Sequence, residues 1–379
     1  MNGRCTLVAL ATKGSGSNDE RRLAGLLSGL DARLLPFDRQ RKVQSFARLL
    51  AALLRQRPDL VVMEGTGVAG GAACLMARLL AGVPYVVSSG DAVAPYLASK
   101  CAWLGPAARL YEKLLYRLSA GFVGWTPYLV GRALTLGAPR GVTAEGWAAD
   151  VPDEHRRAQL RRQTRALLGI PQEALVWGIA GSLNWNRRFA YCYGAELARA
   201  IVRTSRDDLR VLIVGGGSGL HRLRDLAAND PAGRIICTGP VPENRVLAHL
   251  CAMDVGSLPQ SVDGVGSFRY TTKISEYRAA GLPVVTGQTP MGYDLDAGWL
   301  WRLPGRAPWD ERYIQGLARL MQRTTAQDVA RRRAAWSAGA ASFDRQTQAQ
   351  RVASFIRDLL ADRPNRSMAQ TPAAAEVGV

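Results

Sequence analysis

Histidine, lysine and paired cysteines are scarce in this chain of 379 residues. The three histidines, His155, His221 and His249, lie far apart and lack the spacing of zinc ligands, so no zinc site is expected. The six cysteines include no C-x-x-C pair, and most lie inside apolar runs, where a reduced thiol packs as a small hydrophobe. This usage favours a reducing compartment and predicts a cytoplasmic protein.

Long apolar runs are missing as well. The sequence has no stretch of about 18 uninterrupted apolar residues, which argues against a membrane-spanning helix. The apolar stretch near the start is too short for a signal peptide and runs directly into a loop. With 47% hydrophobic and 21% charged residues, the composition is that of a globular protein and excludes a collagen-like or disordered chain. At roughly 150 residues per domain, the length predicts two domains.

One sign of charge dominates the sequence. The formal net charge is +18, and only 5 of the 49 basic residues are lysines. Two explanations stay open: a GC-rich genome that enriches arginine, or an anionic partner such as nucleic acid, anionic lipid or a phosphorylated substrate. No signature of nucleic-acid binding accompanies the charge, so we expect no nucleic-acid partner.

Apolar runs of strand length alternate with segments of helical spacing along most of the chain. The first half predicts strands over residues 5–10, 59–63 and 84–88, with helices over 19–30, 39–57 and 69–80. A second series predicts strands over 174–180, 210–214, 234–238, 255–258 and 283–286. This alternation predicts two α/β domains, each a parallel sheet covered by helices. Ligands bind outside the carboxyl ends of such strands, so two facing domains leave a cleft.

The predicted division has four parts. Residues 1–165 form an N-terminal Rossmann-like domain, and residues 166–345 form a C-terminal Rossmann-like domain. A helix over 346–362 follows, and residues 363–379 lack apolar periodicity and are predicted to be a disordered tail.

Two glycine-rich turns follow predicted strands of the second half. Gly181 begins the first turn, and residues 215–219 form the second. Glycine lets the backbone approach a phosphate, although such turns also close many α/β units without binding anything. Further along, Lys273 and Glu276 begin a helix that Thr271 or Thr272 is placed to cap. In the functional interpretation, Lys273 contacts a phosphate of the ligand and Glu276 accepts hydrogen bonds from ribose hydroxyls. In the alternative, the two residues are solvated charges on a capped helix.

Residues 174–287 resemble the nucleotide-binding half of the family 4 glycosyltransferases, which have the GT-B fold of two Rossmann-like domains facing across a cleft. The resemblance rests on an ordered set of motifs: G-S-L-N-W-N-R-R, V-L-I-V-G-G-G, I-I-C-T-G-P-V-P-E-N, A-M-D-V-G-S-L-P and K-I-S-E-Y-R-A-A-G-L-P-V-V. The first half agrees more loosely, through P-D-L-V-V-M-E-G-T-G and G-V-P-Y-V-V-S-S-G-D. The resemblance implies a nucleotide-sugar donor bound by the second domain and an acceptor bound by the first. It also implies transfer with retention at the anomeric carbon, and no metal or other cofactor.

The turn at Gly181 departs from the family pattern. Relatives usually have G-R-L followed by a lysine, whereas Ser182 stands here in place of the arginine, with Arg187 and Arg188 further on. We expect Arg187 or Arg188 to hold the donor diphosphate with Lys273, unless they are a solvated pair at a helix start. In the first domain, the resemblance implies that Gly14 and Gly16 flank the diphosphate from the opposite side.

A second departure concerns the donor sugar. The family often has two glutamates eight residues apart; Glu276 matches the second, but Phe268 stands at the first. The role of that first carboxylate is therefore in doubt. Asp263 either reaches the same region or is an ordinary turn aspartate. The expected contacts of this loop with the donor sugar or phosphate come from Asp263, Gly264, Gly266 and Ser267.

Two acidic residues of the first domain are candidate catalytic residues. Many relatives carry a histidine after the strand that ends here at Ser89, and this chain has Asp91 nearby. Asp91 contacts the donor sugar or the acceptor, or else it caps the following helix. Glu64, at the end of the preceding strand, is a candidate for acceptor binding or for a base. No definite base is assigned, because the leaving phosphate itself can take the proton.

The predicted function is a retaining, hexosyltransferase-type glycosyltransferase acting on a glycan or lipid-linked acceptor in cell-envelope or exopolysaccharide synthesis. One alternative is a nucleotide-sugar epimerase of similar fold, for which the scattered histidines offer no acid and base set. Another is a non-catalytic nucleotide-sugar-binding scaffold, which the departures at Ser182 and Phe268 leave open.

Basic amphipathic segments lie at residues 39–57 and 100–117. Helices of this kind lie on anionic lipid surfaces, or they pack on a core with a basic outer face. The first interpretation predicts a peripheral protein on the inner face of the membrane.

Overall fold

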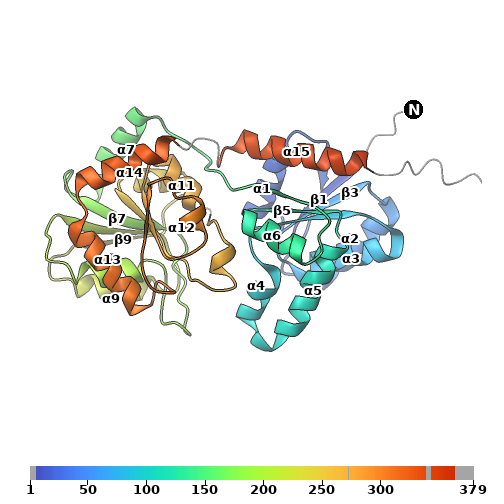
Figure 1. Ribbon diagram of the computed structural model, residues 1–379, viewed down its shortest axis with the longest axis horizontal. Helices are drawn as coiled ribbons and strands as arrows, with labels where there is room; N and C mark the ends of the chain where they lie inside the picture. Colours follow the sequence, from blue (N-terminus) through green and yellow to red (C-terminus); the bar gives the residue numbers. More distant parts are fainter. Residues whose placement is uncertain (1–5, 272, 339–342, 363–379) are drawn as a thin grey trace, which may run out of the picture.

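The computed structural model describes residues 6–271, 273–338 and 343–362. It has two lobes, each with a six-stranded parallel sheet between layers of helices (Figure 1). The elements of the first lobe are β1 (Leu7–Ala11), α1 (Asn18–Leu26), β2 (Ala32–Leu34), α2 (Lys42–Gln56), β3 (Leu60–Glu64), α3 (Val68–Ala81), β4 (Tyr85–Ser89), α4 (Val93–Lys100), η1 (Ala102–Leu104), α5 (Gly105–Arg117), β5 (Gly121–Gly124), α6 (Pro127–Thr135) and β6 (Gly141–Thr143).

The elements that follow build the second lobe and a final helix. They are α7 (Glu154–Leu167), β7 (Leu175–Ala180), α8 (Ala195–Ile201), β8 (Leu209–Val214), α9 (Leu220–Ala228), β9 (Ile235–Gly239), α10 (Glu243–Cys251), β10 (Val255–Leu258), η2 (Gly266–Phe268), α11 (Lys273–Ala279), β11 (Val284–Thr286), α12 (Met291–Asp294), β12 (Leu300–Arg302), α13 (Glu311–Arg323), α14 (Ala326–Ala338) and α15 (Arg345–Ala361). We call the lobes built on β1–β6 and β7–β12 the first and second domains.

Each sheet is wound in two directions from its middle. The strand order is β2-β1-β3-β4-β5-β6 in the first sheet and β12-β11-β10-β7-β8-β9 in the second. The winding reverses between β1 and β3 and between β7 and β10. At such reversals the loops leave the carboxyl ends of neighbouring strands in opposite directions and form the crevice where ligands bind. The prediction of two doubly wound α/β domains is thus confirmed, and the loops after β1, β3, β7 and β10 are the places to examine.

The chain crosses between the domains twice. After β6 it enters the second domain, where α7 packs against α10, and α15 returns to the first domain beside α1 (Figure 1). Arg165 fixes α7 there, since its buried guanidinium donates to the Ala252 carbonyl at 2.9 Å and to the Asp254 carboxylate at 2.7 Å. The predicted boundary after residue 165 therefore falls inside a helix of the second domain. The predicted disordered tail at 363–379 lies outside the described residues.

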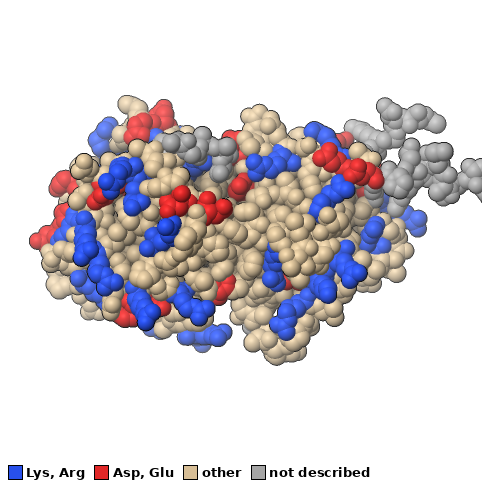
Figure 2. Space-filling model, in the orientation of Figure 1, with Lys and Arg blue, Asp and Glu red and all other residues tan. Residues whose placement is uncertain are grey.

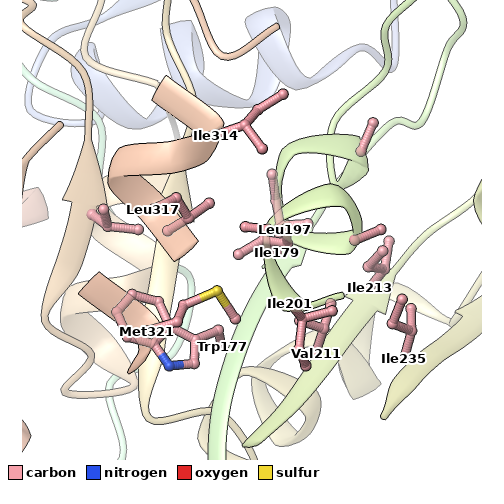
Figure 3. Packing of buried hydrophobic residues seen from close by; sticks show 14 of the residues in the cluster. Trp177, Ile179, Leu197, Ile201, Val211, Ile213, Ile235, Ile314, Leu317 and Met321 are labelled. Carbon is pink, nitrogen blue, oxygen red and sulfur yellow. The ribbon is translucent and has the colours of Figure 1, made fainter. Parts of the chain in front are cut away.

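The core of the second domain explains why its strands read as uninterrupted apolar runs. Alternate residues of β7 belong to different buried clusters: Trp177 and Ile179 to one, Val176 and Ala180 to the other. In the first cluster, β7 and β8 pack against α8 and α13 (Figure 3). A parallel strand with helices on both faces is apolar at every position. The turn after β7 therefore follows a strand whose two faces are both packed in buried clusters, and this packing fixes the position of the turn.

Candidate functional site

The glycine turns after β7 and β8 interlock at the edge of the second sheet. Gly181 N–H donates to the Val214 carbonyl, and Leu183 N–H donates to the Gly216 carbonyl, both at 2.9 Å. A Cβ atom at Gly215 would lie 2.0 Å from the Gly181 carbonyl oxygen, and φ at Gly215 is +133°. Only glycine fits such a close approach at positive φ. The second turn therefore supports the first, rather than forming a separate site.

Lys273 lies directly against the Gly181 turn. A Cβ atom at Gly181, where φ is +150°, would lie 2.9 Å from Lys273 Nζ. The ammonium group is half-buried and stands 4.7 Å from the centre of the Tyr193 ring. The sequence prediction that Gly181 and Lys273 belong to one site fits this geometry, although 92 positions separate them in the chain. Tyr193 was not singled out from the sequence, because nothing in its local pattern marks it.

Glu276 follows Lys273 by one helical turn in α11. Burial raises the pKa of the Glu276 carboxyl; the positive charge of Lys273 lowers it, and the negative charge of Glu243 raises it further. Glu243 begins α10 and forms an ion pair of 3.4 Å with Arg21 of the first domain. The carboxylate, the ammonium group and the Gly181 backbone thus lie at the side of the second domain that faces α1.

The raised pKa of Glu276 predicts pH-dependent nucleotide binding. An ionised carboxylate accepts hydrogen bonds from two hydroxyls, and protonation removes part of that capacity. We expect the affinity for a nucleoside diphosphate to fall with decreasing pH, starting above the ordinary glutamate pKa of about 4.3. Calorimetric titrations across this range should show that Glu276→Gln binds more weakly at neutral pH and without that pH dependence. A parallel pH dependence in the variant would contradict a role for this carboxylate.

The structure leaves the two predicted arginines in solvent. Arg187 and Arg188 are exposed in the loop between β7 and α8, and the Arg188 guanidinium lies 5.2 Å from the centre of the Phe189 ring. The exposed Ser182 hydroxyl accepts a hydrogen bond from the Asn184 side chain at 2.8 Å. This arrangement matches the solvated-pair alternative. The cation that the structure places at the turn is Lys273.

Asp263 completes a tight turn in the loop after β10. Its carboxylate accepts hydrogen bonds from the N–H groups of Val265 and Gly266 at 2.8 Å and from the Ser261 hydroxyl at 2.6 Å. Burial alone would raise the pKa of Asp263, but these hydrogen bonds lower it overall. The turn-aspartate alternative describes what this carboxylate does. A Cβ atom at Gly266 would lie 2.1 Å from the Ser261 carbonyl oxygen, so glycine is required there.

Residues 264–270, which we call the docking segment, join the second domain to the first. The Phe268 side chain packs against the first-domain core, and its carbonyl accepts a hydrogen bond from the Thr126 hydroxyl at 2.9 Å. The Arg132 guanidinium lies 5.4 Å from the centre of the Phe268 ring. At the position where the resemblance implies a glutamate, this chain therefore has an apolar anchor between the domains. Gly264 and Ser267 lie in the same segment, and Gly264 is next to Pro95 of the first domain.

Asp91 pairs across the same junction. Its carboxylate accepts a hydrogen bond and forms an ion pair with the Arg269 guanidinium of the docking segment. The alternative that Asp91 caps the following helix is wrong: the N-cap of α4 is Ala92, and the Val93 N–H donates to the buried Glu112 carboxylate at 2.9 Å. Asp91 thus stands at the junction of the domains, about one-fifth exposed (20%).

Glu64 is buried beneath this surface. Its carboxylate is 3.0 Å from the Arg22 guanidinium and accepts hydrogen bonds from the Ser88 hydroxyl at 2.5 Å and the Trp125 indole at 3.1 Å. Burial raises the pKa of Glu64, and the charge of Arg22 opposes that shift. With no exposed surface, Glu64 has no face for an acceptor. The expectation that it binds acceptor or serves as a base is corrected to a buried partner of Arg22, which the sequence analysis missed.

The first glycine loop connects β1 to α1. Gly14 and Gly16 have φ values of +102° and +77°, and the Gly16 N–H donates to the Glu20 carboxylate at 2.6 Å. This loop leads into α1, whose Arg21 reaches Glu243 in the second domain. The winding reversals of both sheets therefore contribute to one junction. Thr271 belongs to the described residues, whereas Thr272, the other predicted cap of α11, does not.

Two facing, doubly wound domains with glycine turns at their winding reversals define the GT-B architecture of glycosyltransferases. Residues 4–144 match the family model of the glycosyl transferase 4-like domain, and residues 174–302 match that of the glycosyl transferases group 1. The first match lies in the first domain and the second match in the second domain, so each domain matches a glycosyltransferase family. A comparison with curated proteins gives no significant match.

Solved structures resemble the chain over nearly its whole length. Anabaena HepE in complex with UDP-glucose has 16% sequence identity and a TM-score of 0.69, covering 93% of this chain and 99% of that chain. Sucrose-phosphate synthase from Thermosynechococcus elongatus has 14% identity and a TM-score of 0.68, with 94% and 99% covered. WaaG, a glycosyltransferase involved in lipopolysaccharide biosynthesis, has 16% identity and a TM-score of 0.66, with 92% and 99% covered. At these identities the likeness shows the fold.

Two features are not found among the described residues. Within them, no helix has the length and apolarity needed to cross a bilayer. The same residues contain no group of three or more His, Cys, Asp or Glu side chains placed to hold a metal ion. That transfer proceeds without a metal stays a prediction of the sequence analysis.

Proposed function

We propose that the protein transfers a hexosyl group from a UDP-sugar to a glycan or lipid-linked acceptor, with retention of the anomeric configuration. The observation that carries the proposal is the Lys273 ammonium group held against the Gly181 turn at the winding reversal of the second sheet. A cation beside exposed backbone at this edge suits a diphosphate. Glu276, one turn further, suits the ribose. The HepE structures with UDP and UDP-glucose support the choice of uracil nucleotide.

The proposed chemistry is front-face transfer. The bond between the anomeric carbon and the phosphate oxygen breaks, and the acceptor hydroxyl forms its new bond on the same face. The proton of that hydroxyl passes to the leaving phosphate oxygen. Lys273, held against the Gly181 turn, stabilises the charge that develops on the diphosphate, and the protein otherwise contributes positioning. Asp91, at the junction of the domains, is proposed to contact the donor sugar or the acceptor.

Retention is tested with a surrogate acceptor, because the natural acceptor is not identified by the site. Methanol at high concentration accepts the glucosyl group from UDP-α-glucose, and the methyl glucoside formed does not change its anomeric configuration in water. We expect the α-glucoside, recognised by the coupling constant of its anomeric proton in the NMR spectrum. The β-glucoside would overturn retention, and an epimerised nucleotide sugar without glucoside would favour the epimerase instead.

We further propose that the first domain rests on an anionic membrane surface. Residues 39–118 contain eleven basic residues and four acidic ones, Asp59, Glu64, Asp91 and Glu112. None of the four acidic residues is exposed, whereas ten of the basic ones are. Basic side chains follow the lower edge of the first domain in Figure 2. Each basic residue near an anionic bilayer contributes about 1 kcal/mol to binding.

Exposed apolar side chains accompany these charges. Leu79 and Leu80 of α3 are 65% and 64% exposed, Leu110 of α5 is 60% exposed, and Trp103 of η1 is 79% exposed. The sequence analysis did not include α3 in the membrane surface, because the many small residues of this helix give no amphipathic pattern that would mark Leu79 and Leu80 as exposed. Apolar and tryptophan side chains beside basic ones are the features of a surface that enters the lipid headgroup region. This surface suits a peripheral enzyme on the inner face of the membrane.

Flotation with anionic vesicles tests this surface. We expect the protein to float with the vesicles at low salt, and flotation to be lost when Leu79, Leu80 and Leu110 are replaced by serine. Leu167→Ser with Val202→Ser is the matched control, since both residues are exposed on the second domain. Absence of flotation by the unaltered protein, or equal flotation of both variants, would contradict the proposal.

A further inference from the structure

A cavity of about 560 Å³ opens at the carboxyl edge of the first sheet. Its walls are the loop after β1, the loop after β2 and residues 45–52 of α2. Gly14, which the resemblance places beside the donor diphosphate, lines one end of it. A Cβ atom at Gly14 would lie 3.3 Å from the Phe37 carbonyl, so the two loops meet closely there. The cavity therefore adjoins the loop that holds Gly14 and extends away from it along the loop after β2.

Positive charge dominates the mouth of the cavity. Lys13, Arg39 and Arg48 line it, and all three side chains are exposed. Lys13 is 3.0 Å from Asp19, so its charge is partly matched. Asp38 is the acidic residue of the lining, and its carboxylate accepts hydrogen bonds from the N–H groups of residues 40 and 41. The guanidinium groups of Arg39 and Arg48 are thus left as cations for an anionic ligand.

Another part of the lining is apolar. It consists of side chains from the loop after β2 and from α2, namely Leu35, Pro36, Phe37, Leu49 and Ala52. Phe37 and Leu49 belong to the buried core of the first domain, so this wall is fixed by packing. A pocket that combines two guanidinium groups with apolar side chains held by core packing suits a ligand with an anionic and an apolar end. A free sugar matches neither feature.

The pocket also lies beside the proposed membrane surface. Helix α2 supplies both its wall and part of the exposed basic stretch. A molecule anchored in the bilayer would therefore reach the pocket along α2, and its head would arrive next to Gly14. We infer that this pocket binds the phosphate of an amphiphilic acceptor, a phosphate or diphosphate ester of a long apolar alcohol. The inference rests on the proposed transferase function and specifies its acceptor class.

Calorimetry with small probes tests the pocket without the natural acceptor. The probes are decyl phosphate below its micelle concentration, inorganic phosphate and uncharged decyl maltoside. We expect decyl phosphate to bind at least about tenfold more tightly than the other two probes. It alone has both a phosphate for the guanidinium groups and an alkyl chain for the apolar side chains. Replacing Arg39 and Arg48 together by glutamine should weaken decyl phosphate binding by about tenfold or more.

The control variant is Arg55→Gln with Arg57→Gln, which removes the same charge at the other end of α2. It should bind decyl phosphate as the unaltered protein does. If inorganic phosphate bound as tightly as decyl phosphate, the pocket would be a site for free phosphate. If decyl maltoside bound as tightly, it would be an apolar groove. Either result overturns the inference, and so does undiminished decyl phosphate binding by the Arg39 and Arg48 variant. UDP titrations of the same proteins separate the two proposals. If none of the proteins, including the unaltered one, binds UDP, the proposed donor site is refuted and not only the acceptor pocket.

Discussion

Lys273→Ala should weaken UDP binding by about 100-fold, because a charge-assisted contact to a diphosphate contributes roughly 2–3 kcal/mol. The alanine variant leaves the Gly181 turn without its cation, and the exposed Arg187 and Arg188 are not placed to replace it. Calorimetric titration of UDP measures the effect. Lys113→Ala is the control, since Lys113 is an exposed lysine of α5 in the other domain, and it should bind UDP normally.

A second variant separates the charge of Lys273 from its position. Gly181→Ala keeps the lysine but places a methyl group where the Lys273 side chain lies, at a φ of +150° that alanine rarely adopts. We expect UDP affinity to fall in this variant too, with the fold retained by circular dichroism. Normal UDP binding by either variant would show that the nucleotide binds elsewhere.

Phe268→Ala should lower glucosyl transfer to methanol by about 100-fold, the scale on which a displacement of roughly 1 Å affects positioned reactants. The substitution removes the apolar anchor that the docking segment places against the first-domain core. The donor loop and the first domain would then move independently. Small-angle scattering should show a larger radius of gyration, while UDP affinity, set by Lys273 and Glu276, changes little.

Matched variants make this result specific. Phe189→Ala removes an aromatic ring that stacks on Trp309 within the second domain, and it should leave the radius of gyration unchanged. Phe268→Leu keeps an apolar side chain and should restore much of the transfer. If Phe268→Ala kept both full transfer and the original radius, the docking segment would not set the domain arrangement.

The fold was largely predictable because its strands are buried on both faces. The strand predicted at 255–258 coincides with β10, and those at 174–180 and 210–214 differ from β7 and β8 by one residue. Strands β2, β5, β6 and β12 were missed. They have three or four residues each, and β5 begins and ends with glycine, so they present too few apolar positions for a period to emerge.

The site was predictable only where its residues are close in sequence or follow a strand. Lys273 and Glu276 share a helix turn, and Gly181 follows β7 directly. The partners of Asp91 and Glu64 were not predictable, since Arg269 lies 178 positions from Asp91 and Arg22 lies 42 positions from Glu64. Tertiary packing alone brings these charges together. The same limit applies to Phe268, whose apolar neighbours belong to the other domain.

A thermal-shift panel of UDP, GDP, ADP, TDP and CMP with the unaltered protein and the Lys273→Ala variant tests the central claim most directly. The account predicts a rise in melting temperature that grows with UDP concentration, because a ligand that binds only the native state stabilises it by RT ln(1 + [L]/Kd). The rise should be small or absent with the other nucleotides and should disappear in the variant. A folded protein whose melting temperature responds to none of the five, or responds equally in the variant, would contradict the donor site proposed here.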